Sequence, residues 1–270
     1  MKLAISNIAW PLSADAAVAD ALGELGVRGI EIAPTKVWPS PLEASDAALD
    51  AYRRFWEARG ISIIAAQALL FGHPELTLFE DAATRERTFT YLAGIVRVCA
   101  RLGAKALVFG SPKNRRIGSR AVMDVTPEAI DFFGRLAAVA ASHETCVVLE
   151  ANPPEYGADF ITDAGQAAGL VMTVNHPGFR LHLDSACMTL AGDDPREVIP
   201  AAAPLLAHFH ASEPQLAALG TGGIDHARFA APLAAIDYRG WVSIEMRQPE
   251  PFDVTQIERA VRLAQGVYGG

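Results

Sequence analysis

The sequence predicts an α/β protein folded as a single (β/α)8 TIM barrel. Short β-type runs alternate with amphipathic helical stretches eight times along the 270 residues, and strict alternation of this kind is typical of the barrel. The β-type runs are continuously apolar, as in strands that are covered on both faces. A doubly wound open sheet is disfavoured because no glycine-rich turn follows the first strand. No break in composition divides the chain, so we expect one domain over residues 1–270.

The expected elements follow one another without a long structureless insert. We expect strands at about 3–8, 28–32, 61–67, 104–109, 145–149, 179–183, 205–209 and 240–244. We expect helices at about 13–25, 43–58, 83–102, 127–142, 162–174, 194–202, 226–235 and 253–267. Each strand and the helix after it would form one βα unit of the barrel.

Local signals mark several helix ends. Ser13 and Asp15 are suited to cap the first helix, and Asp163 with the preceding threonine opens the fifth. Pro127 is expected at the first position of the fourth helix. Three glycines stand between a helix and the next strand, where a left-handed residue is favoured: Gly26, Gly60 and Gly103.

The charge balance argues against a polyanion as partner. The formal net charge is −8, whereas nucleic-acid binding proteins usually carry a clustered basic face. The one dense basic run covers residues 113–116. We therefore expect a small-molecule substrate and no nucleic acid.

The remaining composition predicts a cytoplasmic protein with no membrane partner. No apolar run reaches the roughly 18 residues that a membrane span needs. The first ten residues lack the basic start and long apolar core of a secretory signal. The cysteines Cys99, Cys146 and Cys187 show no metal-knuckle or CxxC spacing, which fits reduced thiols.

Four side chains that can bind a metal stand at the carboxyl ends of four successive expected strands. They are Glu150, Asp184, His210 and Glu245, and one βα unit separates each from the next. Because active sites of α/β barrels form at the carboxyl ends of the strands, we expect these side chains to converge. Burying several carboxylates without a counter-ion would cost several kcal/mol, so the set predicts a divalent cation.

The ligand types narrow the metal and the chemistry. Three carboxylates with one imidazole favour manganese, cobalt or magnesium, with zinc as a further option. Two vicinal oxygens of a sugar would chelate the ion at its open positions, which would acidify the carbon between a carbonyl and a hydroxyl group. Glu150 and Glu245 would then remove and return the proton through an enediolate. This reading predicts an isomerase or epimerase.

Other polar residues near the expected strand ends are candidates for substrate binding. Lys113 and Arg115 would hold a phosphate or carboxylate, with a solvated loop as the alternative. The remaining candidates are Gln67, Asn152, Glu155, Tyr156, Cys187 and Glu213. His182 and His208 alternate with Asp184 and His210, so strand periodicity points them into the barrel one layer below. They would either hold a metal ligand in place or be ordinary core histidines.

These residues carry a resemblance to a known family. The chain resembles the xylose isomerase-like TIM barrel superfamily, in the sugar phosphate isomerase/epimerase branch. The resemblance rests on Gly29-Ile30-Glu31, Glu150, Leu183-Asp184, His210-Ala211-Ser212-Glu213 and Ile244-Glu245. It implies a carbohydrate substrate, metal binding at the four strand ends and acid/base roles for the two glutamates. The frequent dimers and tetramers of the family also imply a homo-oligomer.

The chain departs from the family pattern at two places. Ketose 3-epimerases carry a histidine where this chain has Cys187 and an arginine where it has Leu216, which argues against 3-epimerisation of free ketoses. The histidines of the three-zinc endonucleases are also missing, with Gln67, Ser111 and Cys187 in their expected places. Two alternatives stay open: a metal-dependent dehydratase resembling inosose or dehydroshikimate dehydratases, and a barrel that binds carbohydrate without catalysis.

Overall fold

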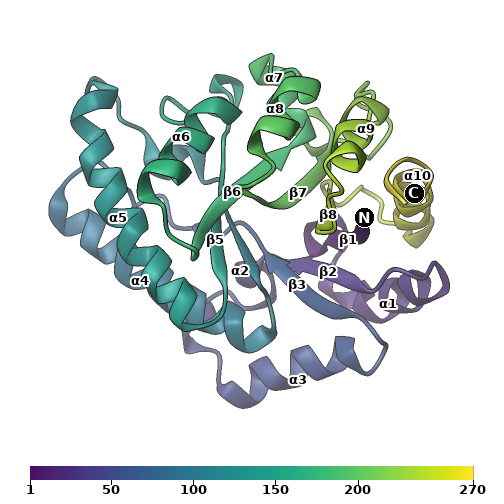
Figure 1. Ribbon diagram of the computed structural model, residues 1–270. Coiled ribbons are helices and arrows are strands. Elements are labelled where there is room, and N and C mark those ends of the chain that lie inside the picture. The colour runs from purple at the N-terminus through teal and green to yellow at the C-terminus, as the bar shows by residue number, and fades with distance from the viewer. Residues whose placement is uncertain (270) are drawn as a thin grey trace.

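The computed structural model describes residues 1–269 and shows a closed barrel of eight parallel strands. Each strand pairs with its neighbours in sequence order, and the last strand pairs with the first. Helices surround this barrel on the outside (Figure 1). The predicted (β/α)8 TIM barrel is therefore confirmed.

The elements lie close to their predicted positions. The strands are β1 Lys2–Ser6, β2 Gly29–Ile32, β3 Ser62–Ala66, β4 Ala106–Phe109, β5 Cys146–Glu150, β6 Phe179–Asp184, β7 Leu206–Ser212 and β8 Trp241–Glu245. The α-helices are α1 Asp15–Glu24, α2 Pro34–Val37, α3 Asp46–Glu57, α4 Ala82–Leu102, α5 Val122–Ser142, α6 Ala164–Val174, α7 Ser185–Ala191, α8 Pro195–Ala202, α9 Ala227–Ala235 and α10 Val254–Tyr268. Short 3-10 helices lie at Asn7–Ala9, Leu12–Ala14, Pro41–Glu43, Pro112–Arg115, Pro154–Tyr156 and Pro214–Leu216.

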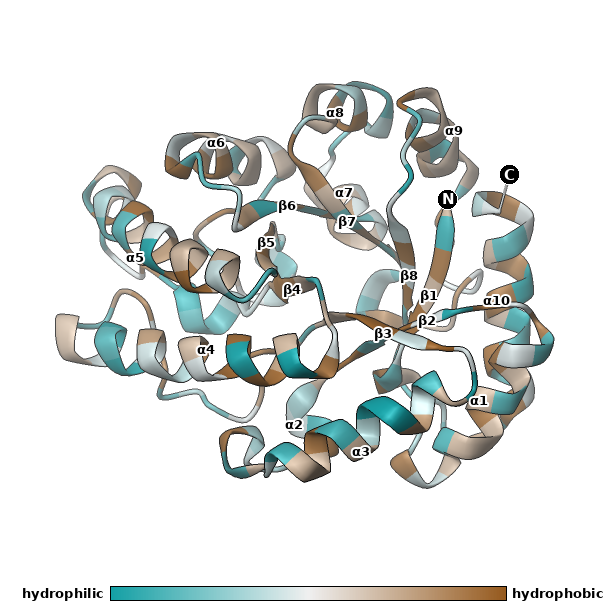
Figure 2. Cartoon of the chain, turned by 60° about the horizontal axis from the view of Figure 1, so that its bottom comes forward, coloured by the Kyte–Doolittle hydropathy of each residue, from teal (hydrophilic) through white to brown (hydrophobic). Residues whose placement is uncertain are grey.

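The core lies inside the barrel and between the barrel and its helices. All residues of β2 and β4 are buried, and Figure 2 shows apolar strands beside helices that carry mixed polar and apolar residues. Burying each large aliphatic or aromatic side chain contributes roughly 1.5–3 kcal/mol. None of the helices within residues 1–269 combines the length and apolar character that a membrane crossing requires.

Most predicted helix ends are confirmed. Asp163 caps α6 by accepting a hydrogen bond from the amide of Gln166 at 2.8 Å. Gly26, Gly60 and Gly103 adopt positive φ angles of 72°, 71° and 101°, which only glycine adopts without a steric cost.

The predicted cap of the first helix is wrong. Ala14 precedes α1 without a side-chain cap, and Asp15 lies in its first turn. The Asp15 carboxylate instead accepts hydrogen bonds from Trp10 Nε1 at 2.7 Å and Tyr52 Oη at 3.3 Å. The Asp15 carboxylate therefore bonds to the side chains of Trp10 and Tyr52 instead of capping the helix.

The predicted start of the fourth long helix is also wrong, because α5 begins at Val122 and contains Pro127. The proline lacks the amide that would bond to the carbonyl of Met123. The neighbouring Thr126 Oγ1 donates a hydrogen bond to the carbonyl of Val122 at 2.7 Å. Pro127 lies in the second turn of α5, and the helix continues through it to Ser142.

The register between strands decides which side chains stand side by side at the carboxyl end of the barrel. Glu150 pairs with His182, Asp184 pairs with His210, and Ser212 pairs with Glu245. This stagger is the strand shear of a closed barrel. His182 therefore stands beside Glu150 and two residues below Asp184 on the same strand.

Candidate active site at the carboxyl ends of β5 to β8

The structure brings the four predicted ligands together. Glu150, Asp184 and Glu245 are the last residues of β5, β6 and β8, and His210 lies near the end of β7. His210 Nδ1 lies 3.5 Å from Glu245 Oε2 and 3.9 Å from Asp184 Oδ2. Three carboxylates and one imidazole thus converge at one rim of the barrel.

Glu31 fixes the imidazole of His210. This glutamate ends the buried run Gly29-Ile30-Glu31 of β2 and is fully buried. Its Oε2 and Oε1 lie 2.9 and 3.1 Å from His210 Nε2. An ionised carboxylate only accepts hydrogen bonds, so Nε2 carries the proton of this contact and Nδ1 faces the other carboxylates.

The charge of Glu31 and His210 is set by their mutual contact. Burial alone would raise the pKa of Glu31, but His210 and His208 outweigh it and hold this pKa well below its usual range. Burial likewise opposes a charge on His210, but the Glu31 and Glu245 carboxylates raise its pKa well above the usual value. The two shifts together indicate a buried ion pair.

The carboxylates at the centre of the site repel one another. Burial, followed by the charges of Asp184 and Glu245, raises the pKa of Glu150 to about 8. Burial and the charge of Glu245 also raise the pKa of Asp184. Without a cation, this cluster therefore retains protons that isolated carboxylates would have lost.

Asp184 is held by the start of α7. Its Oδ1 accepts a hydrogen bond from the amide of Cys187 at 2.6 Å and so caps the helix. Its Oδ2 accepts a hydrogen bond from Ser212 Oγ at 2.5 Å. The short helix α7, which the sequence did not predict, thus orients a predicted metal ligand.

Asn152 and Arg115 orient Glu150. Asn152 Nδ2 donates to Glu150 Oε2 at 2.9 Å, while Asn152 Oδ1 accepts a hydrogen bond from Arg115 Nη2 at 2.8 Å. Arg115 is buried, and burial lowers its pKa to about 10. A Cβ added at Gly110 would overlap Glu150 Oε2, so this position needs glycine. Asn152 therefore contacts a predicted ligand directly, and Arg115 acts on that ligand through Asn152.

A cavity of about 280 Å³ opens above the cluster. Its lining contains the predicted residues Glu150, Asn152, Tyr156, Asp184, Cys187, Glu213 and Glu245. It also contains Pro112, Ala186, Ser212, Gln215, Leu216 and Arg247, which were not among the predicted site residues. Ser212 and Arg247 each follow a predicted ligand by two residues, and strand alternation could have identified them.

Four predicted substrate contacts do not line this cavity. Lys113 and Glu155 are exposed on loops after β4 and β5. Arg115 is buried behind Asn152. Gln67 is buried and donates from Nε2 to Ser6 Oγ at 2.6 Å.

Glu213 lines the cavity, but its carboxylate is also occupied by the loop after β7. Glu213 Oε1 accepts from the amide of Gly220 at 2.8 Å, and Oε2 accepts from the amide of Ile224 at 3.2 Å. His226 Nε2 lies 3.1 Å from Oε1, and its Nδ1 lies 2.9 Å from Tyr268 Oη. The loop after β7, which contains Gly220 and Ile224, is thus folded around the buried carboxylate of Glu213.

The two further histidines differ in their surroundings. His208 Nε2 lies 3.5 Å from Glu31 Oε2. His182 Nε2 lies 3.7 Å from Glu150 Oε1, and neither ring nitrogen of His182 has a hydrogen-bond partner. Burial, followed by the charge of His210, lowers the pKa of His182 well below its usual value.

The donor set fits a divalent cation. The Nδ1 atom of His210 is buried without a hydrogen-bond partner, although it faces two carboxylates. Glu150, His182, Asp184 and His210 each offer a donor atom, and these atoms lie within 4.8 Å of one another. An ion at this place would offset the repulsion among the carboxylates.

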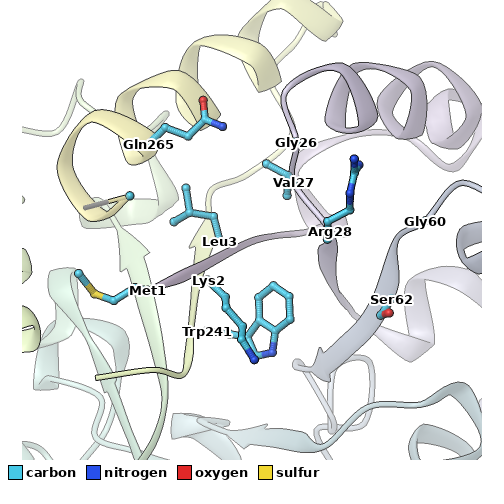
Figure 3. A pocket seen from close by; sticks show the side chains of 11 residues that line it. Met1, Lys2, Leu3, Gly26, Val27, Arg28, Gly60, Ser62, Trp241 and Gln265 are labelled. Carbon is cyan, nitrogen blue, oxygen red and sulfur yellow. The ribbon is translucent and has the colours of Figure 1, made fainter. Parts of the chain in front are cut away.

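A second cavity, of about 700 Å³, lies at the opposite rim. Met1, Lys2, Arg28, Ser62 and Trp241 line it, at the amino ends of their strands (Figure 3). Among residues 1–269, none of its polar side-chain atoms is both buried and unpaired. It therefore lacks the converging polar groups of the cavity at the carboxyl ends.

A parallel (β/α)8 barrel with a buried carboxylate and histidine cluster at the carboxyl ends of its strands defines the class of this protein. The chain belongs to the xylose isomerase-like TIM barrel family, whose sequence model matches residues 19–265. A curated relative, the L-ribulose 3-epimerase of Methylomonas sp. (strain DH-1), is 28% identical over 232 residues, which are 84% of this chain and 77% of the relative.

Solved structures share the fold at low sequence identity. A D-psicose 3-epimerase crystallised with D-fructose superposes with a TM-score of 0.84 at 20% identity, covering 100% of both chains. The D-psicose 3-epimerase of Clostridium cellulolyticum H10 with D-tagatose gives 0.83 at 18% identity and covers 99% of both chains. The IolI protein with a bound zinc atom gives 0.76 at 20% identity and covers 99% of this chain and 96% of its own.

Proposed function

We propose that the protein is a divalent-metal-dependent sugar or sugar phosphate epimerase or isomerase. Glu150 and Glu245 are the proposed acid/base pair. The observation that carries this proposal is that both glutamates and Asp184 line one cavity, with His210 Nδ1 3.9 Å from Asp184 and 3.5 Å from Glu245. Glu150 and Glu245 come from β5 and β8, and β6 and β7 between them carry Asp184 and His210.

The names of the relatives support an epimerase. The curated relative and several superposable structures are 3-epimerases of ketoses, and another superposable structure is the 3-keto-D-glucoside 4-epimerase YcjR of E. coli. The zinc atom of IolI supports a divalent cation in this type of barrel. Manganese, cobalt and magnesium remain the metals that the carboxylate-rich donor set favours.

The proposed chemistry is the transfer of a proton at a carbon next to a carbonyl group. One glutamate of the pair removes this proton, and the same or the other glutamate returns it. The product is either an epimer or an isomer. A divalent cation held by Glu150, Asp184, His210 and Glu245 would supply positive charge against the negative charge that develops on the substrate oxygens. Asp184 is held by the start of α7, His210 by Glu31 and Glu150 by Asn152.

The cavity wall supplies the proposed substrate contacts. Asn152, Tyr156, Cys187 and Gln215 offer neutral polar groups, and Arg247 is the cationic side chain among the lining residues. Lys113 stays a proposed contact only for a substrate that extends beyond this cavity. Arg115 acts through Asn152.

One departure from the family pattern has a structural counterpart. Leu216 stands where ketose 3-epimerases carry an arginine, yet the amide of Arg247 donates to the Leu216 carbonyl at 2.9 Å. The guanidinium of Arg247 also donates to the carbonyl of Gln215. An arginine two residues after the end of β8 therefore stands beside the position of the missing one. The proposal accordingly includes 3-epimerisation of a ketose.

The proposal is tested by exchange of substrate hydrogen with solvent. In D2O, the purified protein should incorporate deuterium into D-psicose or L-ribulose, stop after treatment with a chelator, and recover with Mn²⁺ or Co²⁺. Glu150→Gln and Glu245→Gln should each abolish exchange while far-UV circular dichroism is unchanged, and Glu155→Gln on the exposed loop should retain it. Exchange retained in both site variants would contradict the assigned roles. Loss of water with a new enone absorbance would instead identify a dehydratase.

A further inference from the structure

His182 is a buried histidine without a partner. Its side chain is 1% exposed, and neither Nδ1 nor Nε2 makes a hydrogen bond. A buried polar group without a hydrogen-bond partner destabilises the folded protein. A bound ion or ligand that contacts one of the ring nitrogens of His182 would remove this destabilisation.

The position of His182 points to the proposed cation. His182 is the register partner of Glu150, so the two inward side chains stand side by side. His182 offers one donor atom to a group with Glu150, Asp184 and His210 whose donor atoms all lie within 4.8 Å of one another, and its Nε2 is the nitrogen that faces Glu150. Glu245 is not in that group, because its register partner is Ser212, further along β7.

The distances between donors are too long for good hydrogen bonds and short enough for a shared ion. His182 Nε2 lies 3.7 Å from Glu150 Oε1, and His210 Nδ1 lies 3.9 Å from Asp184 Oδ2 and 3.5 Å from Glu245 Oε2. Hydrogen bonds between such atoms are usually about 2.7–3.2 Å long. Two ligands that each lie about 2.1 Å from one ion are at most about 4.2 Å apart, and all three distances meet this limit.

We propose that Nε2 of His182 is a fifth protein ligand of the divalent cation, beside Glu150, Asp184, His210 and Glu245. This inference rests on the proposed metal dependence and goes beyond its four ligands. A second imidazole shifts the preference of the site from magnesium toward manganese, cobalt or zinc.

His208 provides the matched comparison. It is also buried and also points into the barrel, and it is the register partner of His182. Its Nε2 faces Glu31. It shares a donor group with His182 and His210, but it is not in the group that contains the carboxylates Glu150 and Asp184. The inference therefore assigns ligation to His182 and not to His208.

Electron spin echo spectroscopy of the protein loaded with Mn²⁺ alone counts the coordinated imidazoles. We expect two nitrogen couplings of imidazole in the wild-type protein and in His208→Asn, and one in His182→Asn. One imidazole in the wild-type protein would overturn the inference without any variant, and so would two in a folded His182→Asn protein. If such a protein still epimerises its substrate, the proposed function stands and only the fifth ligand fails. Absence of any bound Mn²⁺ would overturn both.

Metal selectivity gives a second measurement. Competition with a fluorescent chelator should show that His182→Asn lowers the affinity for Co²⁺ at least tenfold and the affinity for Mg²⁺ by less. Equal losses for the two ions, or no loss for Co²⁺, would contradict a nitrogen ligand. The far-UV circular dichroism of His182→Asn provides the folding control.

Discussion

Single residues of the site are held by partners that the sequence pattern did not reveal. Glu31 was visible in the sequence as a carboxylate near the end of an apolar strand, but nothing in one strand shows that it faces His210 on another. The same holds for Arg115, which looks like a loop residue in the sequence and is buried beside Asn152 in the structure. The convergence of the four candidate ligands was predictable because each lies at or near the end of its own strand.

Glu31→Gln should weaken cation binding. The amide still accepts a hydrogen bond from His210 Nε2, but the charge that orients and activates the imidazole is lost. Removing such a partner typically costs 10- to 100-fold in metal affinity, and a chelator competition assay with Mn²⁺ would measure it. Glu155→Gln, on an exposed loop, is the control with the same change of charge. Unchanged affinity in Glu31→Gln would show that His210 needs no such partner.

Asn152→Ala should destabilise the protein. The substitution removes the acceptor of Arg115 Nη2 and the donor to Glu150, and a hydrogen bond to a charged buried group contributes about 1.5–3 kcal/mol. We expect the free energy of unfolding in urea to fall by about 2–3 kcal/mol. Lys113→Ala on the exposed part of the neighbouring loop should change it by less than about 0.5 kcal/mol. Equal effects of the two substitutions would be inconsistent with the hydrogen-bond chain.

The elements of the barrel were predicted more closely than the way they pair. Most ends lie within about three residues of their expected positions, since buried parallel strands read as apolar runs bounded by glycine and helix caps. The helix α7 was missed because its seven residues follow β6 directly. The register between neighbouring strands could not be predicted, because continuously apolar strands show no alternation of polar and apolar residues that would determine which residues pair.

The loop after β7 should loosen in Glu213→Ala. The carboxylate of Glu213 accepts from the amides of Gly220 and Ile224, and without it these amides lose their acceptor. Hydrogen–deuterium exchange of residues 220–224 should accelerate while that of the strands is unchanged. Glu155→Ala is the control, and exchange that stays slow in Glu213→Ala would show that other contacts hold the loop.

The molecule as a whole couples its stability to pH through the buried site. The pKa of Glu150 is raised from 4.5 to about 8 in the folded, metal-free protein. The stabilising contribution of this proton is complete below about pH 4.5 and is lost as pH rises through 8, because the unfolded chain has already released it. A cation replaces the proton, so its affinity follows the opposite trend.

We therefore predict that Mn²⁺ binds up to about tenfold more tightly for each pH unit between about 6 and 8. Titrations at pH 6, 7, 8 and 9 would show this rise and a smaller change above 8. The free energy of unfolding of the metal-free protein should decrease over the same interval, and this decrease should be smaller in Glu150→Gln. An affinity that is independent of pH would contradict a protonated Glu150.

The contact between Glu31 and His210 spans 179 positions of the chain. β2 carries one partner and β7 the other, and they lie on opposite sides of the strands β3 to β6 in barrel order. A nascent or fragmented polypeptide that has not yet closed the ring cannot assemble this pair. Tight uptake of a metal ion would then report that folding is complete.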